Sequence, residues 1–192
     1  MLLMCATSSA QMKWNQSYQT YINQYKDLAI EQMLRYRIPA SITLAQGLFE
    51  SRAGQSDLVR QGNNHFGIKC HNWTGPTQYH DDDARGECFR VYQDAKESYE
   101  DHSRFLARQP RYSRLFSLNT TDYKGWAHGL KSCGYATNPQ YANKLIQIIE
   151  LYRLQDYDKA KSYDRFMATH SGTDVPINAE GTLHPIHIFN DN

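Results

Sequence analysis

A carboxylate follows directly on an apolar helical stretch in the segment LAQGLFESRAGQSDL, which runs from Leu44 to Leu58. Apolar residues recur at helical spacing up to Phe49, and Glu50 stands where this apolar surface ends. Partial burial against such neighbours raises the pKa of a carboxyl group and keeps it protonated near neutral pH. Gly54 lets the chain turn away. We therefore expect Glu50 to face open space as a proton donor.

Such a proton donor suits the hydrolysis of glycosidic bonds. The leaving oxygen must receive a proton while positive charge builds on the sugar ring, and a second carboxylate commonly assists. The segment YHDDDARGECF, from Tyr79 to Phe89, places carboxylates at a turn between two stretches of strand character. We expect this polar hairpin to face Glu50 across a groove.

The elements that must position these groups are mainly helical. Residues recur at helical spacing over about 17–36, 39–50, 94–106, 122–131 and 139–152. Asp94 and Glu97 form a predicted capping box at the start of one of these helices. Strands are predicted at about 77–82 and 87–92, with the turn at 84–86. The predicted fold class is mainly α (α+β), with one small β-hairpin inserted after the helix that ends at Glu50.

Composition narrows the classes of partner. The chain has 192 residues, enough for one core-bearing domain, and a formal net charge of +1, which gives no basic footprint for nucleic acid. No segment approaches the roughly 20 apolar residues of a membrane span. The 14 Tyr and 3 Trp residues suit the lining of a sugar-binding groove, although tyrosines also pack half-buried in many folds.

The cysteines leave alternatives open. Cys70 and Cys88 can form a disulfide in an oxidising compartment, and a zinc site built from Cys70, His71, His80 and Cys88 is the alternative. The spacing lacks a C-x2-C pair, so no metal is expected. Cys133 with His128 would be the start of a cysteine hydrolase, but a structural cysteine is favoured because no third orienting residue is evident.

Several segments together carry a resemblance to a known family. In chain order they are FESRAGQSDL, NNHFGIK, WTG, CFRVYQDAKESYEDHSRFL and GYATNPQYANKLIQIIE. They resemble the glucosaminidases of glycoside hydrolase family 73 over about residues 17–157, and ordered motifs are far more specific than one alone. This family includes the muramidase-like domain of the flagellar peptidoglycan hydrolase and many secreted autolysins. The resemblance implies a lysozyme-like fold, with an α-helical lobe, a small β-hairpin lobe and a groove between them. It also implies endo-β-N-acetylglucosaminidase activity on the glycan strands of peptidoglycan, without a cofactor.

The resemblance also assigns residues. Glu50 matches the catalytic acid of the family's E-S-x-x-G motif, and Tyr135 in GYATNP matches a groove tyrosine that would orient the acetamido group or a water. Substrate contacts are expected from further residues near the groove, namely Asn64, Phe66, Trp73 and Tyr141.

The second carboxylate departs from the family pattern. Many members carry a Glu on the first hairpin strand, whereas counting back from Gly86 places Asp82 there, with Asp81, Asp83 and Glu87 as competitors. Asp is one methylene shorter than Glu. A hairpin carboxylate that activates water would give inversion, and attack by the acetamido oxygen would give retention, so both mechanisms stay open. A lytic transglycosylase and a non-catalytic wall-binding module are the alternative functions.

Domain boundaries follow from composition. Residues 1–10 read as the remnant of a signal peptide, with small residues before a cleavage at Gln11, which predicts export to the periplasm, cell envelope or outside. Residues 11–158 are the expected catalytic domain, and residues 159–192 a linker or partly ordered tail. A monomer is the expected state.

Overall fold

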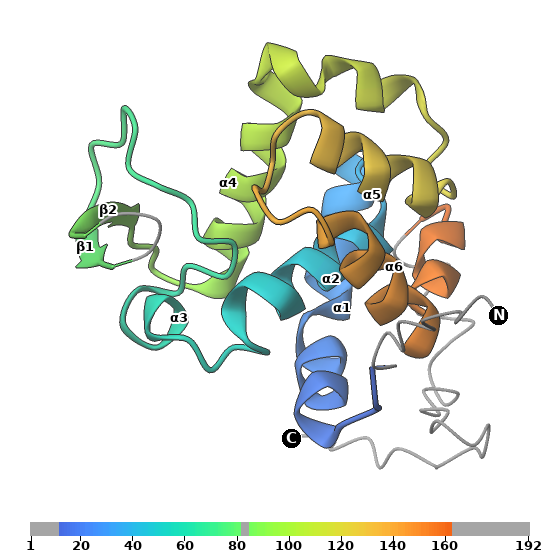
Figure 1. Cartoon of the computed structure of the whole chain (residues 1–192), viewed down its shortest axis with the longest axis horizontal. Coiled ribbons are helices and arrows are strands. Elements are labelled where there is room, and N and C mark those ends of the chain that lie inside the picture. Colours follow the sequence, from blue (N-terminus) through green and yellow to red (C-terminus); the bar gives the residue numbers. More distant parts are fainter. Residues whose placement is uncertain (1–11, 82–84, 163–192) are drawn as a thin grey trace, which may run out of the picture.

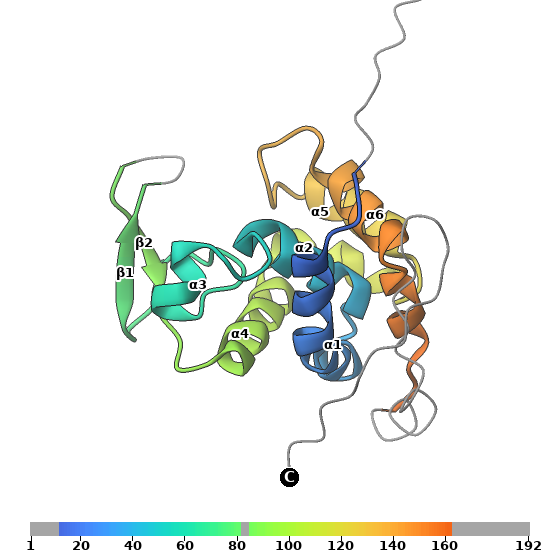
Figure 2. The same cartoon turned by 90° about the horizontal axis from the view of Figure 1, so that it is seen from below.

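The computed structural model describes residues 12–81 and 85–162, and the predicted signal remnant and most of the predicted tail lie outside these ranges. The elements in chain order are α1 (Gln16–Tyr36), α2 (Ala40–Ser51), α3 (Asp57–Gly62), β1 (Thr77–His80), β2 (Glu87–Arg90), α4 (Ala95–Arg108), η1 (Pro110–Ser117), α5 (Tyr123–Ser132), α6 (Tyr141–Leu151) and η2 (Leu154–Lys159). The hairpin and α3 lie together beside the helices in both views (Figure 1 and Figure 2). The predicted mainly α architecture with one hairpin is confirmed.

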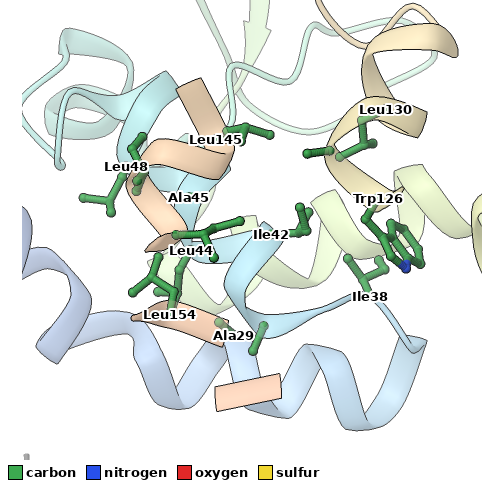
Figure 3. Close-up of a cluster of buried hydrophobic side chains, with 14 of the residues drawn as sticks. Ala29, Ile38, Ile42, Leu44, Ala45, Leu48, Trp126, Leu130, Leu145 and Leu154 are labelled. Atoms are coloured by element: carbon green, nitrogen blue, oxygen red, sulfur yellow. The ribbon is translucent and has the colours of Figure 1, made fainter. Parts of the chain in front are cut away.

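Helix α2 is the central element of the fold. It packs against α1, α5, α6 and η2. Its side chains Ile42, Leu44 and Leu48 are fully buried, and Figure 3 shows Ile42 on the side of Trp126, Leu44 on the side of Leu154 and Leu48 farther along the helix. Burial of each such side chain stabilises the fold by roughly 1.5–3 kcal/mol. The helix is therefore fixed from several sides, which fixes the position of its last turn.

The helix boundaries follow from capping side chains. The Asn15 side chain accepts a hydrogen bond from the Tyr18 amide at 2.9 Å and starts α1. The Asp94 side chain accepts from the Glu97 amide at 2.8 Å and starts α4, as predicted. The Glu97 carboxylate in turn accepts from the Gln93 amide at 2.8 Å, one residue before the cap. The predicted capping box therefore forms in a slightly shifted version.

Three short helical elements were not expected from the sequence. They are α3, η1 and η2, which have 6, 8 and 6 residues. A helical period of 3.6 residues cannot be recognised over so few positions. Each of these elements depends on tertiary packing for its conformation.

The hairpin is shorter than predicted. The strands pair antiparallel from Thr77 opposite Arg90 to His80 opposite Glu87, so the predicted extension of the second strand to Tyr92 is wrong. The reason is that the Tyr92 amide donates to the Gly62 carbonyl at the end of α3, at 2.9 Å, and the chain leaves the sheet.

A disulfide joins the hairpin to the preceding loop. Cys70 and Cys88 are bonded, so the alternative zinc site that needed both thiolates is wrong. Within residues 12–81 and 85–162, no group of three or more His, Cys, Asp or Glu side chains is arranged to hold a metal ion. In the same ranges, no helix is long and apolar enough to cross a membrane.

A buried carboxyl group connects η2 to the start of α2. Asp158 is 4% exposed and accepts hydrogen bonds from the Ser41 amide at 2.8 Å and the Ser41 hydroxyl at 2.6 Å. Burial raises the pKa of Asp158 from 3.8 to about 7, against the opposing effect of these hydrogen bonds. Because the pKa is higher in the folded than in the unfolded state, the folded state binds this proton more tightly. This proton contributes its full stabilisation below pH 3.8, which is the pKa of Asp158 in the unfolded state. The contribution is lost as the pH rises through about 7, the pKa in the folded state.

The variant Asp158→Asn tests this linkage. The wild type should lose stability between about pH 4 and pH 7, the interval between the unfolded and folded pKa values, and the variant should show a flatter profile because its amide does not titrate. Urea unfolding at several pH values measures this. Asp122→Asn is the matched control, because Asn also caps helices well and Asp122 caps α5 from an exposed position. An unchanged slope in Asp158→Asn would contradict the assignment.

Candidate active site

A cleft of about 820 Å³ lies between the hairpin side of the molecule and the helices. We call the segment from α3 through β2 the β-lobe and the remaining described helices the α-lobe. The cleft lining includes Glu50, Arg52, Asp57, Phe66, Lys69, His71, His80, Phe89, Phe105, Arg111, Tyr112, Tyr135 and Tyr141. Both lobes therefore contribute side chains to the cleft, and a ligand that fills it contacts both.

Glu50 stands on the cleft wall one residue before the end of α2. Its side chain is partly buried, while every residue of the helix from Ala40 to Leu48 is fully buried. The chain then turns sharply, because Arg52, Ala53 and Gly54 all have positive φ angles of 51°, 56° and 78°. This turn ends the helix just past the carboxylate. The predicted position of Glu50, at the end of an apolar helix and facing a groove, is what the geometry shows.

Tyr141 holds the carboxylate of Glu50 in place. Its hydroxyl accepts a hydrogen bond from the Gln46 side chain at 2.9 Å, and it is hydrogen-bonded to Glu50. Burial, followed by the nearby Tyr135 and the charge of Glu50, raises the pKa of Tyr141 well above its usual value. The phenol therefore stays protonated and donates to the carboxylate. Gln46 precedes Glu50 by one helical turn, so both side chains leave the same face of α2.

Tyr135 lies beside Tyr141 but differs from it in the hydrogen bonding of its hydroxyl group. The two rings are stacked with centroids 5.7 Å apart. The Tyr135 hydroxyl is buried and has no hydrogen-bond partner among the described residues. Burial and then the charge of Glu50 raise its pKa well above the usual value, so it remains a proton-bearing donor. A buried hydroxyl without a protein partner at a cleft wall is a donor available to a ligand.

Phe66 forms part of the cleft floor. It is 3% exposed and stacks on His102, with centroids 3.9 Å apart and ring planes at 12°. Burial lowers the pKa of His102 to about 3, so the supporting ring is uncharged. Phe66 therefore contributes a small apolar patch to the cleft and is itself held by the surrounding rings.

Asn64 and Trp73 do not line the cleft. The Asn64 side chain accepts from the Ile68 amide at 3.0 Å and donates to the Ile68 and Arg90 carbonyls at 3.0 and 2.9 Å. The Trp73 indole donates to the Pro76 carbonyl at 2.9 Å, and its ring lies under the Arg90 guanidinium at 5.1 Å. Both residues therefore stabilise the β-lobe from within.

The hairpin carboxylates are only partly placed. Asp82 and Asp83 lie outside the described residues. Asp81 is exposed and accepts from the Gly86 amide at 2.8 Å, closing the turn. Glu87 forms an ion pair with Lys69 at 2.8 Å. Cross-strand register puts Glu87 on the same face as His80 and, two positions along, Phe89, and these two side chains line the cleft.

Sequence reasoning missed several lining residues. Phe105, Arg111 and Tyr112 were not singled out from the sequence, yet all three line the cleft. Gln46 was also missed as the partner of Tyr141. The spacing of Gln46 four residues before Glu50 was a usable signal. The Arg111–Tyr112 pair carried no such signal in the sequence, because the short η1 has no recognisable period.

Cys133 contacts the side chain of Arg114. Its sulfur accepts a hydrogen bond from the Arg114 side chain at 3.2 Å. It caps the end of α5, while His128 on the same helix is exposed. Cys133 and His128 are both absent from the cleft lining. This placement does not favour a cysteine hydrolase.

The fold and site define a class. An acid at the end of a buried helix, phenols beside it and an aromatic-lined cleft between an α-lobe and a small β-lobe are the features of a lysozyme-like glycoside hydrolase. The sequence model of the family Glucosaminidase, described as mannosyl-glycoprotein endo-beta-N-acetylglucosaminidase, matches residues 26–154. The chain therefore belongs to this family of enzymes that hydrolyse glycosidic bonds, and the predicted membership of glycoside hydrolase family 73 is confirmed.

Individual relatives agree with this membership. Exo-glucosaminidase LytG of Bacillus subtilis is 35% identical over 65% of this chain and 48% of its own length. Peptidoglycan hydrolase FlgJ of Salmonella typhimurium is 32% identical over 66% of this chain and 43% of its length. The chain thus spans about half the length of these curated relatives. The catalytic domain of the autolysin Auto from Listeria monocytogenes superposes with a TM-score of 0.63 at 30% identity, covering 77% of this chain and 91% of that domain. The predicted lysozyme-like fold is confirmed.

Proposed function

We propose that this chain is an endo-β-N-acetylglucosaminidase that hydrolyses the glycan strands of peptidoglycan. The observation that carries the proposal is the partly buried Glu50 on the cleft wall, hydrogen-bonded by Tyr141 and beside the unpartnered Tyr135 hydroxyl. The family description names a glycoprotein substrate, whereas the relatives include proteins named as peptidoglycan hydrolases. We therefore propose peptidoglycan, as in the names of these relatives, as the substrate.

In the proposed reaction, Glu50 donates its proton to the glycosidic oxygen as the bond to the sugar breaks. Tyr141, held by Gln46, orients the carboxyl group. The Tyr135 hydroxyl donates to the acetamido group of the substrate or to a water. Phe66, which is 3% exposed, gives the substrate a small apolar contact at the bottom of the cleft. Asn64 and Trp73 act through the shape of the β-lobe rather than by touching substrate.

The products test the reaction type. A hydrolase releases fragments that end in a reducing N-acetylglucosamine, whereas a lytic transglycosylase leaves an anhydro-sugar of lower mass by one water. Mass spectrometry of digested peptidoglycan separates the two. Early products of many lengths support cutting within strands, and release of single units from one end would support the exo mode for which LytG is named. Wall binding without any product would support the binding-module alternative.

We propose Asp82 as the second carboxylate, on the register argument from the sequence. Asp82→Asn should lower the rate of reducing-sugar release by about 10²-fold if this group activates water. Glu87→Gln should have a smaller effect, because Glu87 already forms an ion pair with Lys69. Asp81→Asn is the control, since Asp81 is exposed and closes the turn.

The reverse order of effects, with Glu87→Gln inactive and Asp82→Asn active, would move the assignment to Glu87. If neither substitution matters, attack by the acetamido oxygen within the substrate explains the chemistry without a protein base. The configuration of the first product, measured by NMR, distinguishes inversion from retention.

We also propose that the protein is exported and acts as a monomer on the wall. The Cys70–Cys88 disulfide is of the kind that persists in oxidising compartments. Peptidoglycan lies in the cell envelope, where such conditions occur.

A further inference from the structure

Arg111 presents a guanidinium group to the cleft from the start of η1. The guanidinium carbon lies 4.6 Å from the centre of the Tyr112 ring and 5.8 Å from that of Phe105. Both rings also line the cleft. Such cation–π contacts hold the group in one place, and a guanidinium with five N–H donors can bind a further partner while one donor contacts the Tyr112 hydroxyl.

A second basic side chain approaches the same Phe105 ring from the β-lobe. The His71 ring lies nearly parallel to it, at 18°, with centroids 6.4 Å apart. The cleft also contains Lys69, but its ammonium forms an ion pair with Glu87 at 2.8 Å. Arg111 and His71 differ from Lys69. Within the described residues, they contact the side chains of Phe105 and Tyr112, whereas Lys69 contacts a carboxylate.

This basic pair lies close to the proposed acid. The rings of Tyr112 and Tyr135 are 6.2 Å apart, so the ring under Arg111 neighbours the phenol beside Glu50. The charges of Glu50 and Arg111 both act on the Tyr135 hydroxyl, the first raising its pKa and the second lowering it. Glu50 and Arg111 also line the same cleft, so one extended ligand can reach both side chains.

We propose that Arg111, assisted by His71, binds a carboxylate of the substrate and selects muramic acid-containing glycan over neutral N-acetylglucosamine polymers. The inference rests on the proposed function and adds a substrate preference to it. A guanidinium matches a carboxylate with two parallel hydrogen bonds, and a neutral sugar polymer offers no such partner. Peptidoglycan offers carboxylates from two sources, the lactyl group of residues without peptide and the stem peptides.

The test compares one glycan in two charge states. Strands freed of peptide carry lactyl carboxylates, and the same strands converted to methylamides are neutral. For the wild type, KM should be about tenfold lower on the carboxylate form, which corresponds to about 1.4 kcal/mol. For Arg111→Gln, KM should be the same on both forms, with kcat changed less than about twofold. His71→Gln should lose part of the preference.

Arg108→Gln is the matched control, because it removes one positive charge from an exposed position at the end of α4 and outside the cleft lining. It should keep the wild-type preference. Equal losses on both strand forms in Arg111→Gln would overturn the proposal and leave Arg111 a packing role. An unchanged preference, together with no Arg111→Gln defect on strands that retain stem peptides, would overturn it as well.

Two further arms separate the remaining outcomes. Strands that retain stem peptides identify the source of the carboxylate. An Arg111→Gln defect seen only on these strands assigns the stem-peptide carboxylates. A defect seen only on peptide-free strands assigns the lactyl group. Binding of labelled strands of both charge states to Glu50→Gln, with and without Arg111→Gln, measures the preference without turnover. A wild type that cuts neither strand form contradicts the proposed function, whereas the binding comparison still decides the carboxylate site.

Discussion

Glu50→Gln should abolish the release of reducing sugar from purified peptidoglycan. The amide keeps the shape of the side chain but has no proton to give to the leaving oxygen. General acid catalysis contributes about 10²–10⁴-fold, so kcat should fall at least that far. A reducing-end assay on purified wall, with the products checked by mass spectrometry, measures the loss.

The same variant should remain folded. Glu50 stands on the cleft wall after the buried part of α2, so the substitution removes no apolar packing. Its thermal midpoint should stay within a few degrees of the wild type. Asp57→Asn is the matched control, because Asp57 is an exposed carboxylate in the same cleft and should be dispensable for proton transfer. Retention of more than about a tenth of the activity by Glu50→Gln would sink the assignment of the acid.

Tyr135→Phe should separate activity from stability. The Tyr135 hydroxyl is buried without a protein partner, so its removal breaks no internal hydrogen bond and relieves an unsatisfied polar group. Stability should be unchanged or slightly higher. The rate should fall about 10–100-fold, because a donor to the acetamido group or to a water is lost. Chemical unfolding together with kcat and KM on one preparation tests both expectations.

Tyr141→Phe is the informative counterpart. It removes the hydrogen bond from Gln46 at 2.9 Å as well as the contact with Glu50. It should therefore lower stability by about 1 kcal/mol and also lower activity. If Tyr135→Phe destabilises the protein as much as Tyr141→Phe does, the Tyr135 hydroxyl has a structural role and the substrate contact is wrong.

The fold was more predictable than the site. Helices with a sustained apolar period, such as α1 and α6, were located to within a few residues, because the period of the pattern is the period of the structure. The hairpin was located but its ends were not, since the pairing of Tyr92 with Gly62 depends on α3, which has no signal of its own. The register that would place Asp82 as the second carboxylate stays a prediction, because residues 82–84 lie outside the described part of the chain.

The amino-acid sequence by itself determined that a carboxylate ends an apolar helix and that motifs of a glucosaminidase follow in order. Both are local properties, because helical period, caps and turn residues act within a few positions. Only the tertiary structure decided which side chains meet at the cleft. Tyr141 is brought to Glu50, and Arg111 and His71 to Phe105, by the packing of segments far apart in the chain. Such contacts depend on how helices and loops dock, and no local pattern specifies that.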